Sequence, residues 1–152
     1  MQGFDVHKND QVTKRFFKEK VEQYEMDNSF YEWAIVRKED NQFMGEIALV
    51  QYDEKYNAIH LGYYLGKAFR GNGYMQEAID IVLKFVFEEL TVEQVYALIL
   101  NDNISSQKVV LSNNLEYSRT IDNYKDEVYV GSIDKYKITR DKWFELNKKF
   151  SR

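Results

Sequence analysis

The chain has 152 residues, enough for one domain with a sizeable core, and 44% of them are hydrophobic. The sequence shows no apolar run that could span a bilayer, no secretory signal and no proline. It also lacks cysteine, which excludes disulfides and thiolate metal sites and fits a reducing, cytoplasmic location. The net charge of −4 argues against a protein that coats nucleic acid and favours a cationic partner, such as an amine.

The first part of the chain predicts a helix followed by an antiparallel meander. Asn9 or Asp10 can cap a helix that runs to about Met26. Beyond it, runs of apolar and aromatic residues separated by polar turns predict three strands, over 31–35, 43–52 and 58–65.

The second part alternates helices and strands. Helical spacing is clearest over 74–90, where one apolar face contains Ala78, Ile81, Val82, Phe85 and Val86. A continuous apolar run predicts a buried strand over 95–100, and a helix over 103–113 follows it. Two strands within 115–138 and a terminal helix capped by Thr139 complete a mixed α/β domain over residues 1–152.

The segment Arg70-Gly71-Asn72-Gly73-Tyr74-Met75 lies between a predicted strand and a predicted helix. Its glycines allow positive φ and close approach of the backbone to a ligand, and Asn72 also tolerates the left-handed region. The free N–H groups at the start of the helix would point at the same spot, which predicts a phosphate or pyrophosphate site. The alternative is a glycine-rich turn without a ligand. A Rossmann nucleotide site is disfavoured because the preceding strands look antiparallel.

A second strand-to-helix junction carries Asn103-Ile104-Ser105-Ser106-Gln107-Lys108-Val109. Asn103 or Ser105 can cap the helix that begins here. Two helix N-termini therefore follow two strands, as a cleft for an elongated, phosphate-bearing cofactor requires. The alternatives are plain: Asn103 acts only as a cap, and Ser106 is an exposed polar residue.

Three segments in this order resemble the GNAT N-acetyltransferases, and within them the RimJ/RimL type, which acetylates ribosomal-protein N-termini. They are Leu61-Gly62-Tyr63-Tyr64-Leu65, the Arg70–Met75 loop and Asn103-x-x-Ser106-x-x-Val109. Met75 stands where glycine or alanine is commonest in the family loop. The resemblance extends from about His7 to Trp143 and implies a mixed, mostly antiparallel GNAT-type sheet with helices on both faces.

The resemblance also implies acetyl-CoA as cosubstrate, with no metal. Backbone amides of Arg70, Gly71, Asn72, Gly73, Tyr74 and Met75 would hold the pyrophosphate. The strand that ends at Leu65 would pair with the pantetheine arm through its backbone, Asn103 would hydrogen-bond to that arm, and Ser106 would lie near the thioester sulfur. Lys67, Arg70 and Lys108 would neutralise phosphate charge locally, or alternatively form a solvated surface.

The residues for the chemical step depart from the family pattern. His60 stands where many relatives place a glutamate, and a histidine can act as a base directly or through water. The alternative is a histidine beside the cleft without a role. Val110 stands where many relatives place a tyrosine general acid, and Tyr117 lies beyond that helix. Ser106 is the remaining candidate to support the leaving thiolate.

The family usually has a further strand and helix before the position that matches His7. The resemblance thus predicts an uncovered sheet edge, which favours pairing of two chains and a homodimer. The predicted function is acetyl transfer to a primary amine of a protein N-terminus, a polyamine or another small molecule, by direct attack in a ternary complex. The alternative is a non-catalytic CoA-binding sensor or interaction module. Nucleic acid and membranes are not expected partners.

Overall fold

The computed structural model describes residues 31–126 and 129–148. The helix predicted up to Met26, and His7, lie outside these residues. Every element predicted within them is present, and a short 3-10 helix is added to them. In chain order they are β1 (Tyr31–Val36), β2 (Phe43–Asp53), β3 (Ala58–Leu65), η1 (Lys67–Phe69), α2 (Tyr74–Glu89), β4 (Gln94–Leu100), α3 (Ile104–Ser112), β5 (Glu116–Lys125), β6 (Val130–Thr139) and α4 (Arg140–Lys148).

The six strands form one sheet in the order β1-β2-β3-β4-β6-β5. Strands β1, β2 and β3 make the predicted antiparallel meander, and β4, β6 and β5 are also paired antiparallel. Among the strands of the described residues, only β3 and β4 run parallel, and the crossover helix α2 joins them. The mixed, mostly antiparallel sheet expected from the sequence is therefore confirmed.

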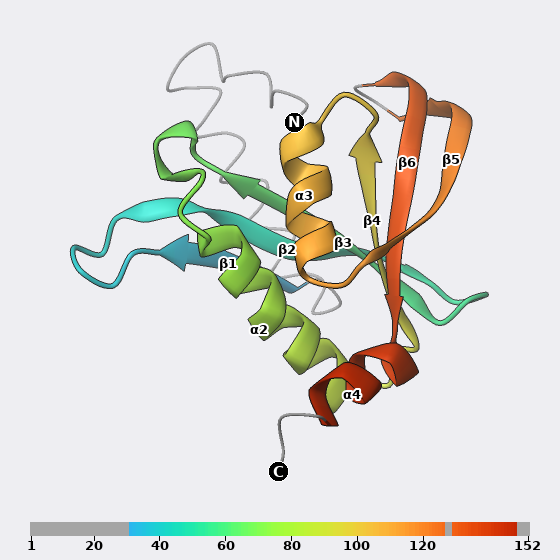
Figure 1. Cartoon of the computed structure of the whole chain (residues 1–152), viewed down its shortest axis with the longest axis horizontal. Helices are drawn as coiled ribbons and strands as arrows, with labels where there is room; N and C mark the ends of the chain where they lie inside the picture. The colour runs from blue at the N-terminus through green and yellow to red at the C-terminus, as the bar shows by residue number, and fades with distance from the viewer. Residues whose placement is uncertain (1–30, 127–128, 149–152) are drawn as a thin grey trace, which may run out of the picture.

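The parallel pairing of β3 and β4 is short, and this shapes the whole molecule. It covers Ala58–His60 against Gln94–Tyr96, after which the two strands diverge. In Figure 1, β1, β2 and β3 run across the view whereas β4, β5 and β6 stand steeply to them. The register of β2 against β3 shifts between Leu49 and Gln51, close to the point of divergence, and such a bulge bends and twists its strand. The carboxyl ends of β3 and β4 are consequently separated.

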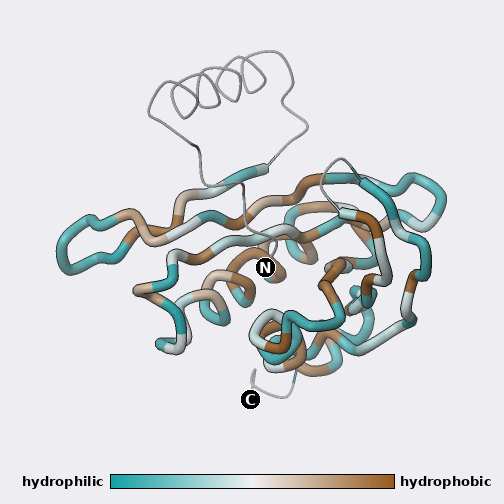
Figure 2. The backbone as a smooth tube through the Cα atoms, turned by 90° about the horizontal axis from the view of Figure 1, so that it is seen from above, coloured by the Kyte–Doolittle hydropathy of each residue, from teal (hydrophilic) through white to brown (hydrophobic). Residues whose placement is uncertain are grey.

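Helices α2, α3 and α4 lie on one face of the sheet, as Figures 1 and 2 show from two directions. The fully buried side of α2 consists of Met75, Ile79, Val82, Leu83, Val86 and Phe87, which pack on the sheet. Ile81, expected on the apolar face, is instead 62% exposed because the buried stripe is centred on Ile79 and Val82. None of the helices within residues 31–126 and 129–148 is long and apolar enough to cross a membrane.

Local sequence signals explain where several elements end. Asn114 follows α3 with φ of 63°, a left-handed conformation that asparagine tolerates at a helix terminus. The Thr139 hydroxyl accepts a hydrogen bond from the Lys142 N–H at 3.3 Å, which confirms it as the cap of α4. At Gly45 a Cβ atom would clash with the Tyr64 carbonyl oxygen, so only glycine allows β2 to approach β3 there.

Candidate active site

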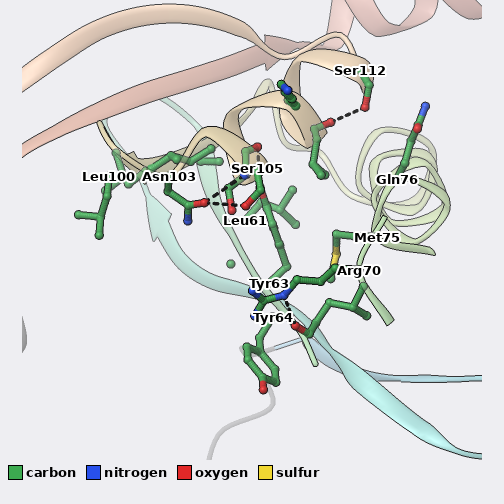
Figure 3. Close-up of a pocket in the computed structure, with 18 of the residues that line it drawn as sticks. Leu61, Tyr63, Tyr64, Arg70, Met75, Gln76, Leu100, Asn103, Ser105 and Ser112 are labelled. Atoms are coloured by element: carbon green, nitrogen blue, oxygen red, sulfur yellow. Dashed lines mark hydrogen bonds between the residues drawn. The ribbon is translucent and has the colours of Figure 1, made fainter. Parts of the chain in front are cut away.

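A cleft of about 770 Å³ occupies the space where β3 and β4 diverge. Its walls are Leu61–Leu65 of β3, 97–100 of β4 and the first turns of α2 and α3. Figure 3 shows side chains from these elements converging on the cavity, with Tyr63 and Arg70 on one side and Asn103 and Ser105 on the other. The fold thus brings together all three segments on which the sequence prediction rested.

The loop before α2 is built for close approach of a ligand to the backbone. Gly71 and Gly73 have φ of 79° and 81°, and nothing lies within 4 Å of where a Cβ would stand on either. Gly73 is also the N-cap of α2 and has no side chain to satisfy the free N–H groups. These open donors and the positive end of the helix dipole fit a pyrophosphate, which the loop could hold through backbone amides.

Asn72 behaves differently from its two glycine neighbours. It is not among the described residues with positive φ, so the left-handed tolerance of asparagine is not used here. Its side-chain amide instead donates to the carbonyls of Phe69 and Arg70, at 3.3 and 3.2 Å. Asn72 is not among the residues that line the cleft, so its side chain stabilises the loop from outside.

Of the three basic residues expected at the mouth, Arg70 and Lys108 line the cleft and Lys67 does not. The Arg70 Nε donates to the Leu65 carbonyl oxygen at 3.0 Å, which ties the loop to the end of β3. The exposed Lys108 projects from α3 on the opposite wall. Both side chains therefore place positive charge on the walls of the cleft.

The second helix N-terminus is capped by its own chain. The Oδ1 atom of Asn103 accepts from the Ser106 N–H at 3.2 Å and from the Ser105 hydroxyl at 3.0 Å. The cap predicted for this helix is therefore Asn103 and not Ser105. Because the oxygen is occupied, the amide nitrogen of Asn103 is the atom left to donate into the cleft.

His60 lies at the narrow end of the cleft, where β3 and β4 are last paired, and alternation along β3 places its side chain on the face opposite to Tyr63. Its ring stacks on Tyr96 with centroids 5.1 Å apart, and the Lys135 ammonium lies 4.0 Å over the same tyrosine ring. Burial, followed by the positive charge of Lys135, lowers the pKa of His60 to about 4. The imidazole is consequently neutral at pH 7 and able to accept a hydrogen bond or a proton.

Ser106 lines the cleft in the first turn of α3 and receives a contact that the sequence did not predict. The Tyr63 hydroxyl on β3 donates to the Ser106 carbonyl oxygen at 3.2 Å. Val110, by contrast, is fully buried in the core, and Tyr117 is 55% exposed and pairs with Thr120 on β5. Neither replaces the tyrosine of the family pattern.

Tyr63, Tyr124 and Asp126 are among the lining residues that had no predicted role. Tyr63 belongs to one of the matching segments. Like Leu61 and Leu65, it lies on the face of β3 that turns towards the helices, because every second residue of a strand shares a face. That alternation was the available signal for it. Tyr124 lies near the end of β5 and Asp126 directly after that strand, and nothing local in the sequence connects them with the cleft.

Comparison with known proteins identifies the class to which this cleft belongs. The family model "Acetyltransferase (GNAT) domain" matches residues 1–116. The chain therefore belongs to the GNAT acetyltransferase family.

A relative and two solved structures add detail. The chain is 30% identical over 81 residues to "Probable N-acetyltransferase YjcK" of Bacillus subtilis, covering 53% of this chain and 45% of that protein. It shares its fold with the ribosomal-protein-S5-alanine acetyltransferase of Vibrio fischeri, with TM-score 0.72, 18% identity and coverage of 88% and 73%. The microcin C7 self-immunity acetyltransferase MccE, solved with acetyl-CoA and AMP, superposes with TM-score 0.72, 14% identity and coverage of 84% and 71%. The chain spans about half the length of curated relatives that it matches.

Proposed function

We propose that this domain is an N-acetyltransferase of the RimJ/RimL type, which moves an acetyl group from acetyl-CoA to a primary amine. The observation that carries the proposal is the open loop with left-handed Gly71 and Gly73 at an uncapped helix N-terminus, placed where two strands diverge. An elongated ligand with a pyrophosphate at one end fits this arrangement. Acetyl-CoA would supply the activated thioester.

The cleft residues divide the work of binding. Backbone amides from Gly71 to Met75 hold the pyrophosphate, and Arg70 and Lys108 add positive charge. The end of β3 at Leu65 pairs with the pantetheine arm, to which Asn103 donates from across the cleft. Ser106 then lies beside the thioester sulfur. This chain has no cysteine to carry an acetyl group, which favours direct attack by the amine in a ternary complex.

His60 serves as the proton acceptor for the attacking amine, directly or through a water molecule. The support for this role is its place at the narrow end of the cleft and its neutral form at pH 7. A base with a pKa of about 4 is weak, so the entering amine must itself be neutral or its ammonium proton must leave through water. We expect turnover to rise with pH as the acceptor amine loses its proton.

A thermal melt with acetyl-CoA, CoA and NADH tests the donor site. A ligand at about 100 times its dissociation constant stabilises a protein by about 2.7 kcal/mol. For a domain of this size we expect the melting temperature to rise by about 5–10 °C with acetyl-CoA and CoA. NADH should leave it unchanged, since its pyrophosphate joins two nucleosides and has no pantetheine arm. A chain that gains no stability from CoA would refute the proposal.

The second candidate function is a CoA-binding sensor or interaction module without catalysis. Buried Val110 favours it, because the usual tyrosine donor is missing there. Release of free CoA from acetyl-CoA over a panel of N-terminal peptides, polyamines and small amines separates the two functions. Binding of CoA without release on any amine would support the module.

We also propose a cytoplasmic homodimer. Strand β1 ends the sheet and has no strand partner on its outer side among the residues described here. An edge of this kind offers free backbone donors and acceptors to a second copy. Light scattering at micromolar concentration is the test, and a monomeric mass would contradict the dimer.

A further inference from the structure

The transfer step needs a partner for the sulfur atom that leaves. Val110 is fully buried and aliphatic, so the position that supplies a tyrosine in many relatives offers nothing here. Tyr117 is 55% exposed on β5 and is not among the residues that line the cleft. A donor, if the domain has one, must come from another element of the cleft wall.

Most hydroxyl groups that line the cleft have their protons engaged elsewhere or point away. Ser105 donates to the side chain that caps its own helix, at 3.0 Å. Ser112 donates to a backbone carbonyl of α3 at 2.7 Å. Tyr64 alternates with Tyr63 on an extended strand, so its side chain points to the other face of the sheet. Tyr124 is engaged in a side-chain hydrogen bond with Asp126, and Tyr74 lies directly after the glycine turn, where the pyrophosphate and not the sulfur would bind. Tyr63 and Ser106 are left as the hydroxyl-bearing pair between β3 and α3.

Tyr63 is held in place at this point of the cleft. Its ring is partly buried and packs against the hydrophobic core, which fixes its direction. Its hydroxyl reaches across from β3 to the first turn of α3 and donates to the Ser106 carbonyl oxygen at 3.2 Å, a long bond for an O–H donor. A stronger acceptor close by, such as an anionic sulfur, can therefore compete for this proton at little cost.

We propose that Tyr63 is a further catalytic residue, whose hydroxyl donates a hydrogen bond to the CoA thiolate as it leaves. The inference rests on the proposed function. The amine nitrogen attacks the thioester carbonyl carbon, a C–N bond forms and the C–S bond breaks. The sulfur leaves with the bonding electron pair and accepts the hydrogen bond from the Tyr63 hydroxyl. The surplus proton on nitrogen passes to water, which can carry it to His60 on the other face of β3, so the tyrosine stays protonated throughout.

The acidity of Tyr63 suits donation of a hydrogen bond and not transfer of the proton. Burial raises the pKa of Tyr63 to about 12, against a smaller opposing contribution from a hydrogen bond with the Ser106 side chain. A free thiol has a pKa of about 8.5, so the sulfur anion is the weaker base and cannot remove the phenol proton. A phenol is also a stronger donor than the aliphatic hydroxyl of Ser106, which makes Tyr63 the better of the two.

The test is the pKa of the CoA thiol bound to the protein, followed by ultraviolet absorbance of the thiolate. Tyr63→Phe removes the hydrogen bond to the charged sulfur, and this loss should raise the pKa of the bound thiol by about 1–2. We expect kcat to fall by about tenfold to a hundredfold while the dissociation constant of CoA stays within a factor of about two. Tyr117→Phe removes an exposed hydroxyl outside the cleft and should change none of these quantities.

Two results would overturn the role. If the thiol pKa is unchanged and CoA binds more weakly, Tyr63 only ties β3 to α3. If wild-type protein binds no CoA, the proposed function fails and this inference with it, whereas binding with an unchanged thiol pKa refutes Tyr63 alone. Incorporation of 3-fluorotyrosine at position 63 provides a second variant that keeps the ring and the hydroxyl. Its more acidic phenol should lower the pKa of the bound thiol below the wild-type value.

Discussion

The two strand-to-helix turns that line the cleft differ in whether a side chain caps the helix that follows. The turn from β3 to α2 uses Gly71 and Gly73 in left-handed conformations, and Gly73 offers no side chain to cap the helix. The turn from β4 to α3 uses Asn103, whose side chain accepts from the Ser106 N–H and caps the helix itself. One turn leaves its backbone donors open, and the other closes them.

This difference indicates what each turn can bind. Open amides and an unscreened helix dipole attract an anion, so the glycine turn suits a pyrophosphate. At the α3 turn the amide of Ser106 is already bonded, and what Asn103 presents to the cleft is a neutral donor. A neutral donor suits an amide or carbonyl of the pantetheine arm. The same kind of element therefore supplies charge recognition on one wall and neutral hydrogen bonding on the other.

The largest expected effect comes from closing the open turn. In Gly73→Val a branched side chain would occupy the space that is now empty next to the backbone amides, at φ of 81°. We expect CoA affinity to fall more than about a hundredfold and the ligand-induced stabilisation of about 2.7 kcal/mol to disappear. Isothermal titration with CoA measures the first quantity and thermal melts the second.

Asn41→Val is the matched control for that substitution. Asn41 also has positive φ, 56°, but it lies in the exposed turn between β1 and β2, away from the cleft. Both variants should lose about 1–2 kcal/mol of stability from forcing a branched residue into the left-handed region. Unchanged CoA affinity in Gly73→Val, or an equal loss in Asn41→Val, would show that the glycine turn is not the anion site.

The next effect concerns His60, at the narrow end of the cleft, and the dependence of stability on pH. His60 has a pKa of about 4 in the folded protein, below the ordinary value of 6.5, because burial and the Lys135 charge disfavour its cation. The unfolded chain binds a proton on this residue as pH falls below about 6.5, whereas the folded chain does so only near pH 4. The free energy of unfolding should therefore decrease by about 2–3 kcal/mol between pH 6.5 and 4 on account of His60.

His60→Phe isolates this contribution, because phenylalanine keeps a flat ring to stack on Tyr96 and cannot titrate. Denaturant unfolding of both proteins across this pH interval gives the difference directly. We expect wild type to lose stability more steeply than the variant as pH falls, with parallel curves above pH 7. Equal slopes in the acid range would mean that the folded protein admits the imidazolium ion.

Local sequence patterns were enough for most of the fold. Alternation, helical spacing and the caps at Asn103 and Thr139 predicted the helices and strands of the described residues close to their observed bounds. The divergence of β3 and β4 was not predictable, because it depends on how many residues of the two strands pair with each other. The paired residues are 36 positions apart in the sequence, so this is a non-local property. Ile81 was misplaced for a similar reason, because the width of the apolar stripe on α2 is decided by what packs on it.

In the candidate site, too, local features were predictable and features that depend on tertiary contacts were not. The glycine turn and the Asn103 cap were predictable because each is encoded within a few consecutive residues. The contact of Tyr63 with Ser106 joins positions 43 residues apart and depends on the distance between β3 and α3. The lowered pKa of His60 likewise depends on surroundings that β4 and β6 supply through Tyr96 and Lys135. The residue type was enough to propose His60 as a base, but its lowered pKa could be predicted only from the tertiary structure.

The smallest expected effect concerns the turn from β4 to α3, where the Asn103 side chain would both cap the helix and hydrogen-bond to the ligand. Asn103→Ala should lose the cap, which costs about 1 kcal/mol of stability, together with the donor to the ligand. Asn103→Asp should keep the cap, since a carboxylate accepts from the Ser106 N–H equally well and favours the positive end of the helix dipole. It cannot donate, so CoA should still bind less tightly, by about fivefold to tenfold.

The pair of variants separates the two roles by comparing melting temperature with CoA affinity. If Asn103 acts on the ligand, Asn103→Asp melts like wild type and binds CoA more weakly. If it acts only as a cap, the aspartate variant binds CoA like wild type, and the alanine variant loses stability and affinity together. Adding salt distinguishes lost donation from charge repulsion, because repulsion between the new carboxylate and the CoA phosphates is screened by salt whereas a missing hydrogen bond is not.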